Sequence, residues 1–581
     1  MSFLGVENSL TGRRWLGLGI DLERAAEHMA QQTGLPSPLC QVLARRGVPA
    51  HEAQGFLTPH LKDLLPDPRR MKDMELAAAR FLEAVQARQR IAIFADYDVD
   101  GGSSAALLLV WLRAMGLQAT LYIPDRIDEG YGPNEEAMAG LAQAHDLIVC
   151  VDCGTLSHGP IAAAKGADVI VLDHHLGGET LPDCVAVVNP NRQDEDGELG
   201  YFCAAGVVFL MLVEVRRQAR EKGISTGPDL MGLLDLVALA TVADVAPLVG
   251  ANRALVRQGL KVLGARQRPG LVALADVSRM DAAPSTYHLG FLLGPRVNAG
   301  GRIGKADLGA RLLATENPHE AAALAERLDQ LNTERRDIEN AVRAAAMEQA
   351  EARGFDAPLV WAAGEGWHPG VVGIVASRLK EAAGRPAVVI GLHNGEGKGS
   401  GRSVSGIDLG VAIQRTAAEG LLIKGGGHKM AAGLTVEENK LEAAMERLGD
   451  LLAKQGAGSL GPADLKLDGM LMPGAANIDL IEQIEQAGPF GAGAAAPRYG
   501  FPDLAIRFAK RIGETHLKLS LTDGVGGNLD AICFGAFDTA LGPRLLEHGG
   551  ARFHFAGRLE INSWGGRQSP QLRLEDAAEA S

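Results

Sequence analysis

Four apolar runs, each ending in acidic or imidazole side chains, form the clearest pattern in the first half of the chain. They lie in the stretches 91–104, 146–155, 168–176 and 234–247. Short apolar runs bounded by glycine and polar residues are typical of buried strands. From about residue 73 to residue 305, such runs alternate with helical patterns. This alternation predicts an α/β fold in which helices cover both faces of a mostly parallel sheet.

Polar side chains stand at the end of each predicted strand. They are Asp96, Asp98, Asp100, Asp152, Asp173, His174, His175 and Asp244. The carboxyl ends of parallel strands share one edge of a sheet, so we expect these side chains to converge there. Crowded carboxylates repel one another unless a cation lies between them, and hard oxygen ligands suit Mg²⁺ or Mn²⁺. Each motif alone could be an exposed acidic turn or a satisfied histidine pair, but four in order favour a metal site.

The same four motifs resemble those of the DHH phosphoesterase superfamily. They read DYDVDG (96–101), VDCG (151–154), DHH (173–175) and TVAD (241–244). From about residue 73 to its end, the chain is similar to a family of single-strand-specific 5′→3′ DNA exonucleases that act in DNA repair and recombination. That family releases mononucleotides, which is therefore the activity we expect.

The resemblance implies a catalytic site with two divalent cations, Mn²⁺ or Mg²⁺. Two such ions about 4 Å apart activate a water for in-line attack on phosphorus. We expect Asp152 to bridge the ions, His175 to contact the scissile phosphate, and Asp173 to orient an imidazole. The expected metal ligands are Asp96, Asp98, Asp100, Asp152, His174 and Asp244.

Two segments rich in glycine and proline adjoin the predicted metal edge. Residues 122–134 follow a predicted strand and should form a loop, and residues 292–307 place arginines and a lysine among glycines. Guanidinium groups in such a setting suit contacts to phosphate. A packed structural loop is the alternative for the first segment. The resemblance assigns four substrate contacts, namely Arg126, Tyr131, Arg302 and, as second choice, Arg296.

A long helix and a second α/β lobe are predicted next. Leucines at helical spacing follow a stripe through residues 307–353, which favours a helix that joins two domains. Beyond it lie three basic, glycine-rich segments, read here as loops, at 364–381, 397–409 and 424–433. They resemble the DHHA1 domain that accompanies DHH domains. The resemblance assigns Ser400 and Arg402 to grip the 5′-terminal phosphate and places His428 in the substrate cleft.

The last part of the chain alternates like β structure. Leu517, Leu519 and Leu521 should face a core while Lys518 faces solvent, and the glycines at 524–527 predict a hairpin turn. Basic residues interleave with aromatic ones, which suits a barrel that binds single strands. The exonuclease family carries an OB fold here, although the junction PFGAGAAAP (489–497) departs from the family's motif.

We therefore expect five parts in the chain. Arg13, Arg14 and Trp15 belong to the first part, which either contacts a partner or caps the catalytic domain. A small-residue linker is expected at 456–461. The parts are an N-terminal helical segment (1–72), the DHH domain (73–305), a connecting helix (306–354), the DHHA1 domain (355–457) and the OB-fold domain (458–581).

Charge and composition exclude some classes of protein. A formal net charge of −14 argues against coating nucleic acid by bulk attraction, but it leaves room for a local basic channel. Six cysteines in 581 residues do not suggest a disulfide framework, and Cys150 and Cys153 flank Asp152 on a buried strand, which argues against zinc. No apolar run approaches the ~20 residues of a membrane helix, so we expect a cytoplasmic protein.

Two other functions compete with the exonuclease reading. Small-substrate phosphodiesterases and pyrophosphatases share the metal motifs but lack the barrel and the 292–307 segment. An inactive nucleic-acid-binding protein would have lost ligands, and all of them are present here. The family also implies a monomer that meets single-stranded DNA, a single-strand-binding protein and a helicase.

Overall fold

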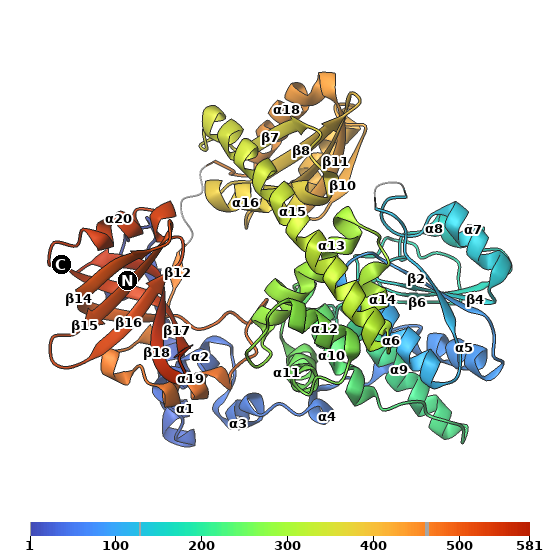
Figure 1. Cartoon of the computed structure of the whole chain (residues 1–581), viewed down its shortest axis with the longest axis horizontal. Helices are drawn as coiled ribbons and strands as arrows, with labels where there is room; N and C mark the ends of the chain where they lie inside the picture. Colours follow the sequence, from blue (N-terminus) through green and yellow to red (C-terminus); the bar gives the residue numbers. More distant parts are fainter. Residues whose placement is uncertain (1, 127–128, 459–463, 581) are drawn as a thin grey trace. The chain divides into compact units, whose positions relative to one another are not determined.

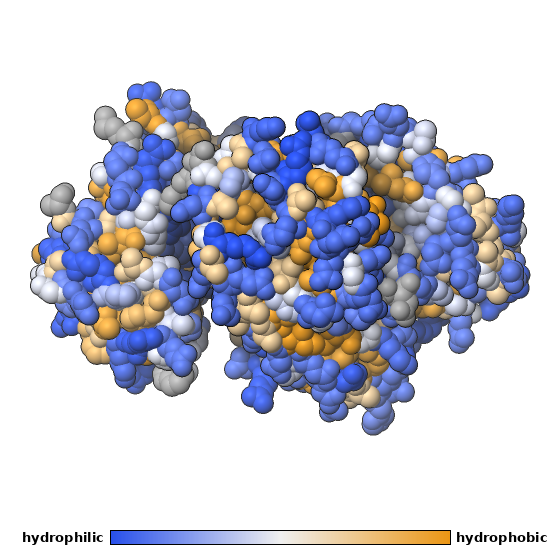
Figure 2. Space-filling view, turned by 90° about the horizontal axis from the view of Figure 1, so that it is seen from above, coloured by the Kyte–Doolittle hydropathy of each residue, from blue (hydrophilic) through white to orange (hydrophobic). Residues whose placement is uncertain are grey.

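The computed structural model describes residues 2–126, 129–458 and 464–580. The chain divides into two compact units, Leu65–Leu460 and Met1–Leu64 together with Gly461–Ser581. The linker expected at 456–461 lies partly outside the described residues. None of the helices in the described ranges is long and apolar enough to cross a membrane. On the face drawn in Figure 2, hydrophilic residues dominate and apolar patches interrupt them.

A five-stranded, all-parallel sheet forms the first lobe of the larger unit, which confirms the predicted α/β class (Figure 1). Its strand order is β3-β2-β4-β5-β6. Every residue of β2 and of β4 is buried, as expected for inner strands covered on both faces. The strands are β2 (Ile91–Ala95), β3 (Ala119–Tyr122), β4 (Leu147–Val151), β5 (Asp168–Leu172) and β6 (Ala186–Val188).

Two helices of this lobe begin or end at the polar motifs. Helix α6 starts inside the acidic loop that follows β2, and α10 ends at Asp244. The helices are α5 (Met74–Gln86), α6 (Val99–Ala114), α7 (Glu135–Ala144), α8 (His158–Ala163), α9 (Ala204–Glu221), α10 (Leu234–Ala243), α11 (Gly250–Gly264), α12 (Pro269–Val277), the π-helix η5 (His288–Leu293), α13 (Gly294–Ile303) and α14 (Leu308–Ala314).

The prediction of a fourth strand at 234–247 is wrong, because this run is the helix α10. Leu234 to Thr241 are all buried, so the run shows no amphipathic periodicity. A fully buried helix and a fully buried strand cannot be distinguished by periodicity alone. Asp244 still reaches the expected edge, as the residue that caps the helix C-terminus.

Helix α15 (Pro318–Arg353) connects the first lobe to a second sheet (Figure 1). It begins at its proline because Asn317 caps the N-terminus by accepting from the backbone N–H groups of His319 and Glu320. The buried leucines 324, 328 and 331 lie on the predicted stripe. The second lobe comprises β7 (Val360–Glu365), α16 (Pro369–Ala383), β8 (Ala387–His393), β9 (Glu396–Arg402), α17 (Leu409–Ala418), β10 (Lys424–Gly427), β11 (Ala431–Glu437) and α18 (Leu441–Ala453), with strand order β10-β11-β9-β8-β7.

The glycine-rich segment at 397–402 is a strand in the middle of this sheet, not a loop. A Cβ on Gly399 would lie 2.8 Å from Ile390 Cγ1, and one on Gly401 would lie 2.6 Å from Leu409 Cδ2. The alternate glycines therefore leave room for the hydrophobic core. Ser400 and Arg402, which alternate with them, project from the other face of the sheet.

The smaller unit is a closed five-stranded barrel, as predicted. Leu517, Leu519 and Leu521 are fully buried, Lys518 is exposed, and β15 pairs with β16 across the predicted glycine turn. The elements are β12 (Leu465–Lys466), β13 (Gly469–Met470), α19 (Ile478–Glu485), β14 (Tyr499–Ile512), β15 (His516–Thr522), β16 (Asn528–Cys533), α20 (Leu541–Leu546), β17 (Arg552–Trp564) and β18 (Arg567–Glu579).

The N-terminal segment packs on this barrel. Strand β1 (Trp15–Leu16) pairs with β12, and the buried Trp15 indole donates to Asp576 Oδ2 at 2.9 Å. Arg13 lies 3.5 Å from the same carboxylate, and Arg14 pairs with Asp464 at 2.8 Å. These three residues therefore tie the two ends of the chain together. The helices α1 (Ile20–Thr33), α2 (Ser37–Arg45), α3 (Ala53–Leu57) and α4 (Leu61–Leu64) complete the segment.

Candidate metal centre

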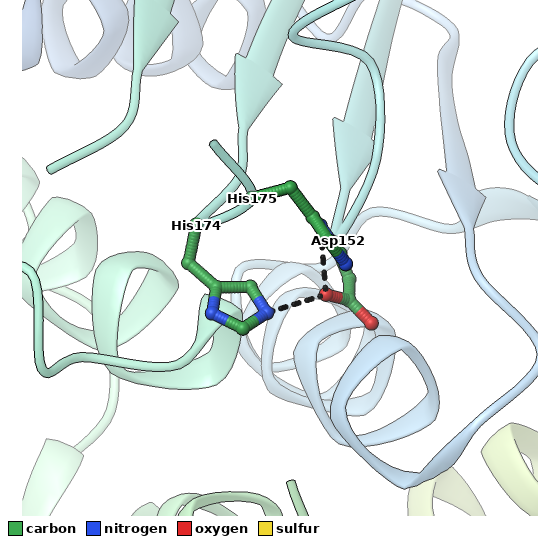
Figure 3. Close-up of side chains that lie close together, drawn as sticks. All are labelled: Asp152, His174 and His175. Carbon is green, nitrogen blue, oxygen red and sulfur yellow. Dashed lines mark ion pairs between the residues drawn. The ribbon is translucent and has the colours of Figure 1, made fainter. Parts of the chain in front are cut away.

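One edge of the parallel sheet gathers the predicted polar side chains around Asp152. His174 Nε2 lies 3.3 Å from Asp152 Oδ1 and 3.6 Å from Asp100 Oδ2. The same nitrogen lies 3.9 Å from Asp244 Oδ2. His175 Nδ1 lies 3.9 Å from Asp152 Oδ1, and Figure 3 shows both imidazoles directed at that oxygen.

Three overlapping groups of side chains could hold a metal ion. In each group one ligand atom per residue lies within 4.8 Å of the others. Asp152 belongs to two of the groups and His174 to two, so the groups form one continuous cluster. The groups are Asp96 with Asp98 and Asp152, Asp152 with His174 and His175, and Asp100 with His174 and Asp244.

Two unsatisfied oxygens indicate that this cluster suits a cation. Oδ1 of Asp96 and Oδ1 of Asp152 are buried and have no hydrogen-bond partner among the described residues. A buried polar atom without a partner costs about 1–3 kcal/mol, so such atoms call for an explanation. A divalent ion bound by carboxylate and imidazole supplies that missing interaction.

The backbone holds Asp152 in an unusual conformation. Its φ is 61°, in the left-handed region that residues other than glycine rarely adopt. Its backbone N–H donates to Leu172 O at 2.9 Å, which fixes the turn against β5. Such strain, of order 1–3 kcal/mol, clusters at functional sites.

Two helix N-termini position the acidic loop after β2. Asp98 Oδ1 caps α6 by accepting from the N–H groups of Asp100 and Gly101, at 2.9 and 3.1 Å. The buried carboxylate of Asp100 in turn accepts from Ala204 and Ala205 at the start of α9, at 2.7 and 2.8 Å. The role of α9 could not be predicted from the sequence, because no motif marks the backbone amides that Asp100 uses.

The Asp173 carboxylate accepts hydrogen bonds from the neighbouring imidazole and from Thr155. Its Oδ1 accepts from His175 Nδ1 at 2.8 Å, and its Oδ2 accepts from Thr155 Oγ1 at 2.7 Å. The Asn189 side chain donates to Thr155 Oγ1 and to His175 O, and Asn191 donates to His174 O. The two asparagines were missed at the sequence level, because asparagines are common in loops of every kind.

Burial raises the pKa of the clustered carboxyls. Desolvation is the largest cause at Asp96, Asp100, Asp152 and Asp244, and repulsion between the carboxylates adds to it. The pKa of Asp244 rises to about 9. At Asp173, burial alone would raise the pKa, but hydrogen bonds from His175 and Thr155 outweigh it and hold the pKa below its usual value. At His175, burial alone would lower the pKa, but the hydrogen bond to Asp173 and its charge outweigh this effect and raise the pKa to about 9.

These pKa directions predict that metal binding releases protons. A carboxyl of pKa about 9 holds its proton at pH 7, and the ion must displace that proton. Mn²⁺ affinity should therefore rise with pH between 6.5 and 8.5, by about tenfold per pH unit for each proton displaced. Titration calorimetry in buffers of different ionisation enthalpy would count the protons. The Asp244→Asn variant should show a shallower rise, and an affinity that does not change with pH would contradict the prediction.

The predicted substrate residues fall into two sets. The Arg126 guanidinium lies 5.1 Å from the Tyr97 ring centre, and the half-exposed Tyr131 donates through Oη to Asp152 O at 3.0 Å, so both lie beside the cluster. Arg296 instead donates to Asp329 of α15 at 2.8 Å and to Leu292 O at 2.8 Å, which locks α13 to α15.

The remaining residues lie on α13 and in the second lobe. Arg302 donates through Nη1 to Gly370 O at 3.0 Å, and burial followed by the charge of Arg126 lowers its pKa to about 10. Arg402 Nη1 donates to Ser400 Oγ at 2.9 Å, so these two side chains form one polar pair. His428 is exposed at the turn between β10 and β11.

Three family models match separate parts of the chain. Residues 90–241 match the DHH family, N-terminal domain, residues 356–454 match the DHHA1 domain, and residues 467–576 match the RecJ OB domain. These ranges contain the metal cluster apart from Asp244, which lies three residues beyond the first match, together with the Ser400–Arg402 pair and most of the barrel.

Curated relatives match almost the whole chain. The single-stranded-DNA-specific exonuclease RecJ of Salmonella typhimurium is 37% identical over 95% of this chain and 98% of its own length. The protein of that name in Escherichia coli is 36% identical over 93% of this chain and 96% of its own. The crystal structure of RecJ from Thermus thermophilus in complex with Mn²⁺ matches with a TM-score of 0.80 at 30% identity, covering 97% of this chain and 79% of that one.

Proposed function

The chain belongs to the RecJ family of single-stranded-DNA-specific exonucleases, and on this basis we propose a role for each group of its site residues. It hydrolyses single-stranded DNA with the help of Mn²⁺ or Mg²⁺. We infer that it starts at the 5′ end and releases mononucleotides. The observation that best supports the proposed chemistry is the cluster around Asp152, in which residues from separate segments offer ligand atoms within 4.8 Å of one another.

We propose that six side chains hold two divalent ions. They are Asp96, Asp98, Asp100, Asp152, His174 and Asp244. Asp152 is proposed as the shared ligand because it belongs to groups on both sides of the cluster. When bound, the ions supply a Lewis acid that lowers the pKa of the attacking water and offsets charge on the phosphate.

His175 is proposed to contact the scissile phosphate without holding metal, and Asp173 is proposed to orient its imidazole. The hydrogen bond from Nδ1 to Asp173 fixes the imidazole and favours its charged form. A cationic imidazole offsets the negative charge that develops on the phosphate oxygens in the transition state. Tyr131 Oη, 3.1 Å from His175 Nε2, limits how that ring can rotate.

The Ser400–Arg402 pair is proposed to hold the 5′-terminal phosphate. Both side chains face α16 at the start of its second turn, where a Cβ on Gly373 would lie 3.1 Å from each of them. A helix N-terminus, a hydroxyl and a guanidinium together suit an anion with several oxygens. Arg126 and Arg302 would contact the phosphates between this pair and the metal cluster, and His428 would line the cleft.

A row of cations on the barrel is proposed to bind the strand beyond the active site. Lys510 on β14 is paired in register with Lys518 on β15, and Ile532 separates Lys518 from Arg573 on β18. All three cations are exposed. Arg573 lies 5.1 Å from the ring centre of Phe534, a half-exposed aromatic on which a base could stack.

Replacing Lys510, Lys518 and Arg573 together by alanine should lower the affinity for single-stranded DNA. It should also make that affinity less dependent on salt concentration. Each lost phosphate contact should lower the slope of log affinity against log salt by about 0.7. Fluorescence anisotropy in EDTA, which prevents hydrolysis, measures this slope. The control replaces Arg544 and Arg552, two barrel cations outside the row that are ion-paired with Glu579 and Asp503, as Arg573 is with Glu560. Equal slopes in the two variants would show that these three cations do not form the DNA-binding surface.

A labelled-DNA assay separates this function from its alternatives. The protein with Mn²⁺ is incubated with 5′-labelled single strands, with duplexes and with dinucleotides. We expect the single strands to release their label as mononucleotide and the duplexes to release none. Activity confined to dinucleotides would favour a small-substrate phosphodiesterase, and no hydrolysis would favour an inactive binding protein.

We also propose the wider setting that family membership implies. The enzyme would work in the cytoplasm as a monomer, beside a single-strand-binding protein and a helicase.

A further inference from the structure

Helix α13 lies directly against the acidic loop of the metal cluster. Asn298 Oδ1 accepts from the backbone N–H of Val99 at 3.1 Å. Three residues on, the α13 backbone approaches Tyr97 so closely that a Cβ on Gly301 would lie 2.6 Å from Tyr97 O. Tyr97 and Val99 alternate with the proposed metal ligands, so α13 is in contact with the backbone that carries those ligands.

The C-terminal turn of α13 contacts Gly370 of the second lobe. A Cβ on Gly370 would overlap the carbonyl oxygen of Arg302 and would lie 3.1 Å from the Arg302 carbonyl carbon. Arg302 Nη1 also donates to Gly370 O at 3.0 Å. His368 Nδ1 would also lie 2.9 Å from this Cβ, and that side chain can rotate away. The two Arg302 atoms belong to the backbone, so no side-chain rotation could relieve the overlap with them.

The next turn of α16 contacts the proposed terminal-phosphate pair, which lies on β9. Gly373 lies one turn after Gly370, and a Cβ there would lie 3.1 Å from Arg402 Nη2 and from Ser400 Oγ. Contacts without intervening flexible side chains therefore run from Tyr97 through α13 to Gly370. From Gly373 they continue to Ser400 and Arg402.

We propose that α13 and Gly370 form a spacer that sets the distance between the terminal-phosphate pair and the metal cluster. This inference rests on the proposed function, since it assumes that both places contact one DNA strand. A fixed distance determines which phosphodiester bond reaches the cluster when the 5′-phosphate is held. Gly370 is then a positioning residue, which selects the first bond and hence mononucleotide products.

The test compares Gly370→Ala with wild type on two single strands that differ only in a 5′-phosphate or a 5′-hydroxyl. The alanine must displace α16 from α13, so a held 5′-phosphate no longer places the first bond at the cluster. We expect the ratio of kcat/KM for the phosphorylated over the hydroxyl strand to fall about tenfold. Dinucleotides should appear among the products of the phosphorylated strand.

Gly449→Ala is the matched control. Gly449 lies in α18 of the same lobe, and a Cβ there would meet only Leu359 Cβ at 3.9 Å, an ordinary contact. This variant should keep the wild-type ratio and products. A Gly370→Ala protein that loses activity equally on both strands would show a general structural defect and overturn the spacer.

A second variant covers the case in which Gly370→Ala fails to fold. Gly373→Ala presses only on the ends of the Ser400 and Arg402 side chains, which can yield by a few tenths of an ångström. It should lower the phosphate preference by a smaller factor, and an unchanged preference would count against the spacer. If wild type itself shows a ratio near one for kcat/KM on the phosphorylated over the hydroxyl strand, both the proposed phosphate pair and the proposed spacer are wrong. Metal-dependent hydrolysis of single strands would survive that result, so the two failures are distinguishable.

Discussion

Asp98→Asn should abolish turnover while the protein stays folded and still binds DNA. Losing one carboxylate from the metal cluster should remove several kcal/mol of transition-state stabilisation, or on the order of a thousandfold in kcat. Asparagine is the informative replacement because Asp98 also caps α6. An asparagine oxygen caps a helix about as well as aspartate does, so the variant removes charge and keeps the cap.

Asp98→Ala should also abolish turnover, but it additionally loses the cap, at a cost of about 1 kcal/mol. The comparison therefore separates the metal ligand from the helix cap. Thermal unfolding should show Asp98→Asn at least as stable as wild type without metal, because a repelling charge is gone. A variant that keeps more than a tenth of the wild-type kcat would remove Asp98 from the ligand set.

His175→Gln should lower kcat by about 10²–10³-fold with little change in KM. The imidazole is proposed to stabilise charge that develops only in the transition state, and deleting one such group typically has this effect. Glutamine keeps a polar group near Asp173 but cannot carry the positive charge. Steady-state kinetics on a single strand of fixed length would measure both constants.

Tyr131→Phe is the control for the position of the ring. It removes only the Oη contact to His175 and to Asp152 O, so it should lower kcat far less than His175→Gln does. Similar losses in the two variants would mean that ring position, and not imidazole charge, limits the rate. A His175→Gln protein that no longer binds Mn²⁺ would make His175 a metal ligand.

The sequence predicted the elements whose pattern is local. The inner strands β2, β4 and β5, the joining helix and the barrel hairpin were found from periodicity and turn residues, whereas the edge strand β6 was not predicted. The predicted metal residues come together in the structure because each follows a segment whose packing the apolar pattern determines. Even Asp244 was placed at the right edge, although α10 was predicted as a strand.

What the sequence did not show depends on contacts between distant segments. The cap that Asp100 provides for α9 and the support from Asn189 and Asn191 join residues more than ten positions apart. The strand β9 was predicted as a loop because glycine usually marks turns, whereas here three glycines make room for core side chains. The meeting of Arg302 and Gly370 likewise has no sequence signature.

The central claim is that residues from separate segments bind two catalytic cations at one edge of the sheet. Anomalous diffraction from crystals grown with Mn²⁺ tests it most directly. We predict two anomalous peaks, with Asp152 in contact with both and with His174 and Asp244 in contact with at least one. Peaks that lie elsewhere, or a cluster that stays empty while Mn²⁺ supports hydrolysis in solution, would contradict the account.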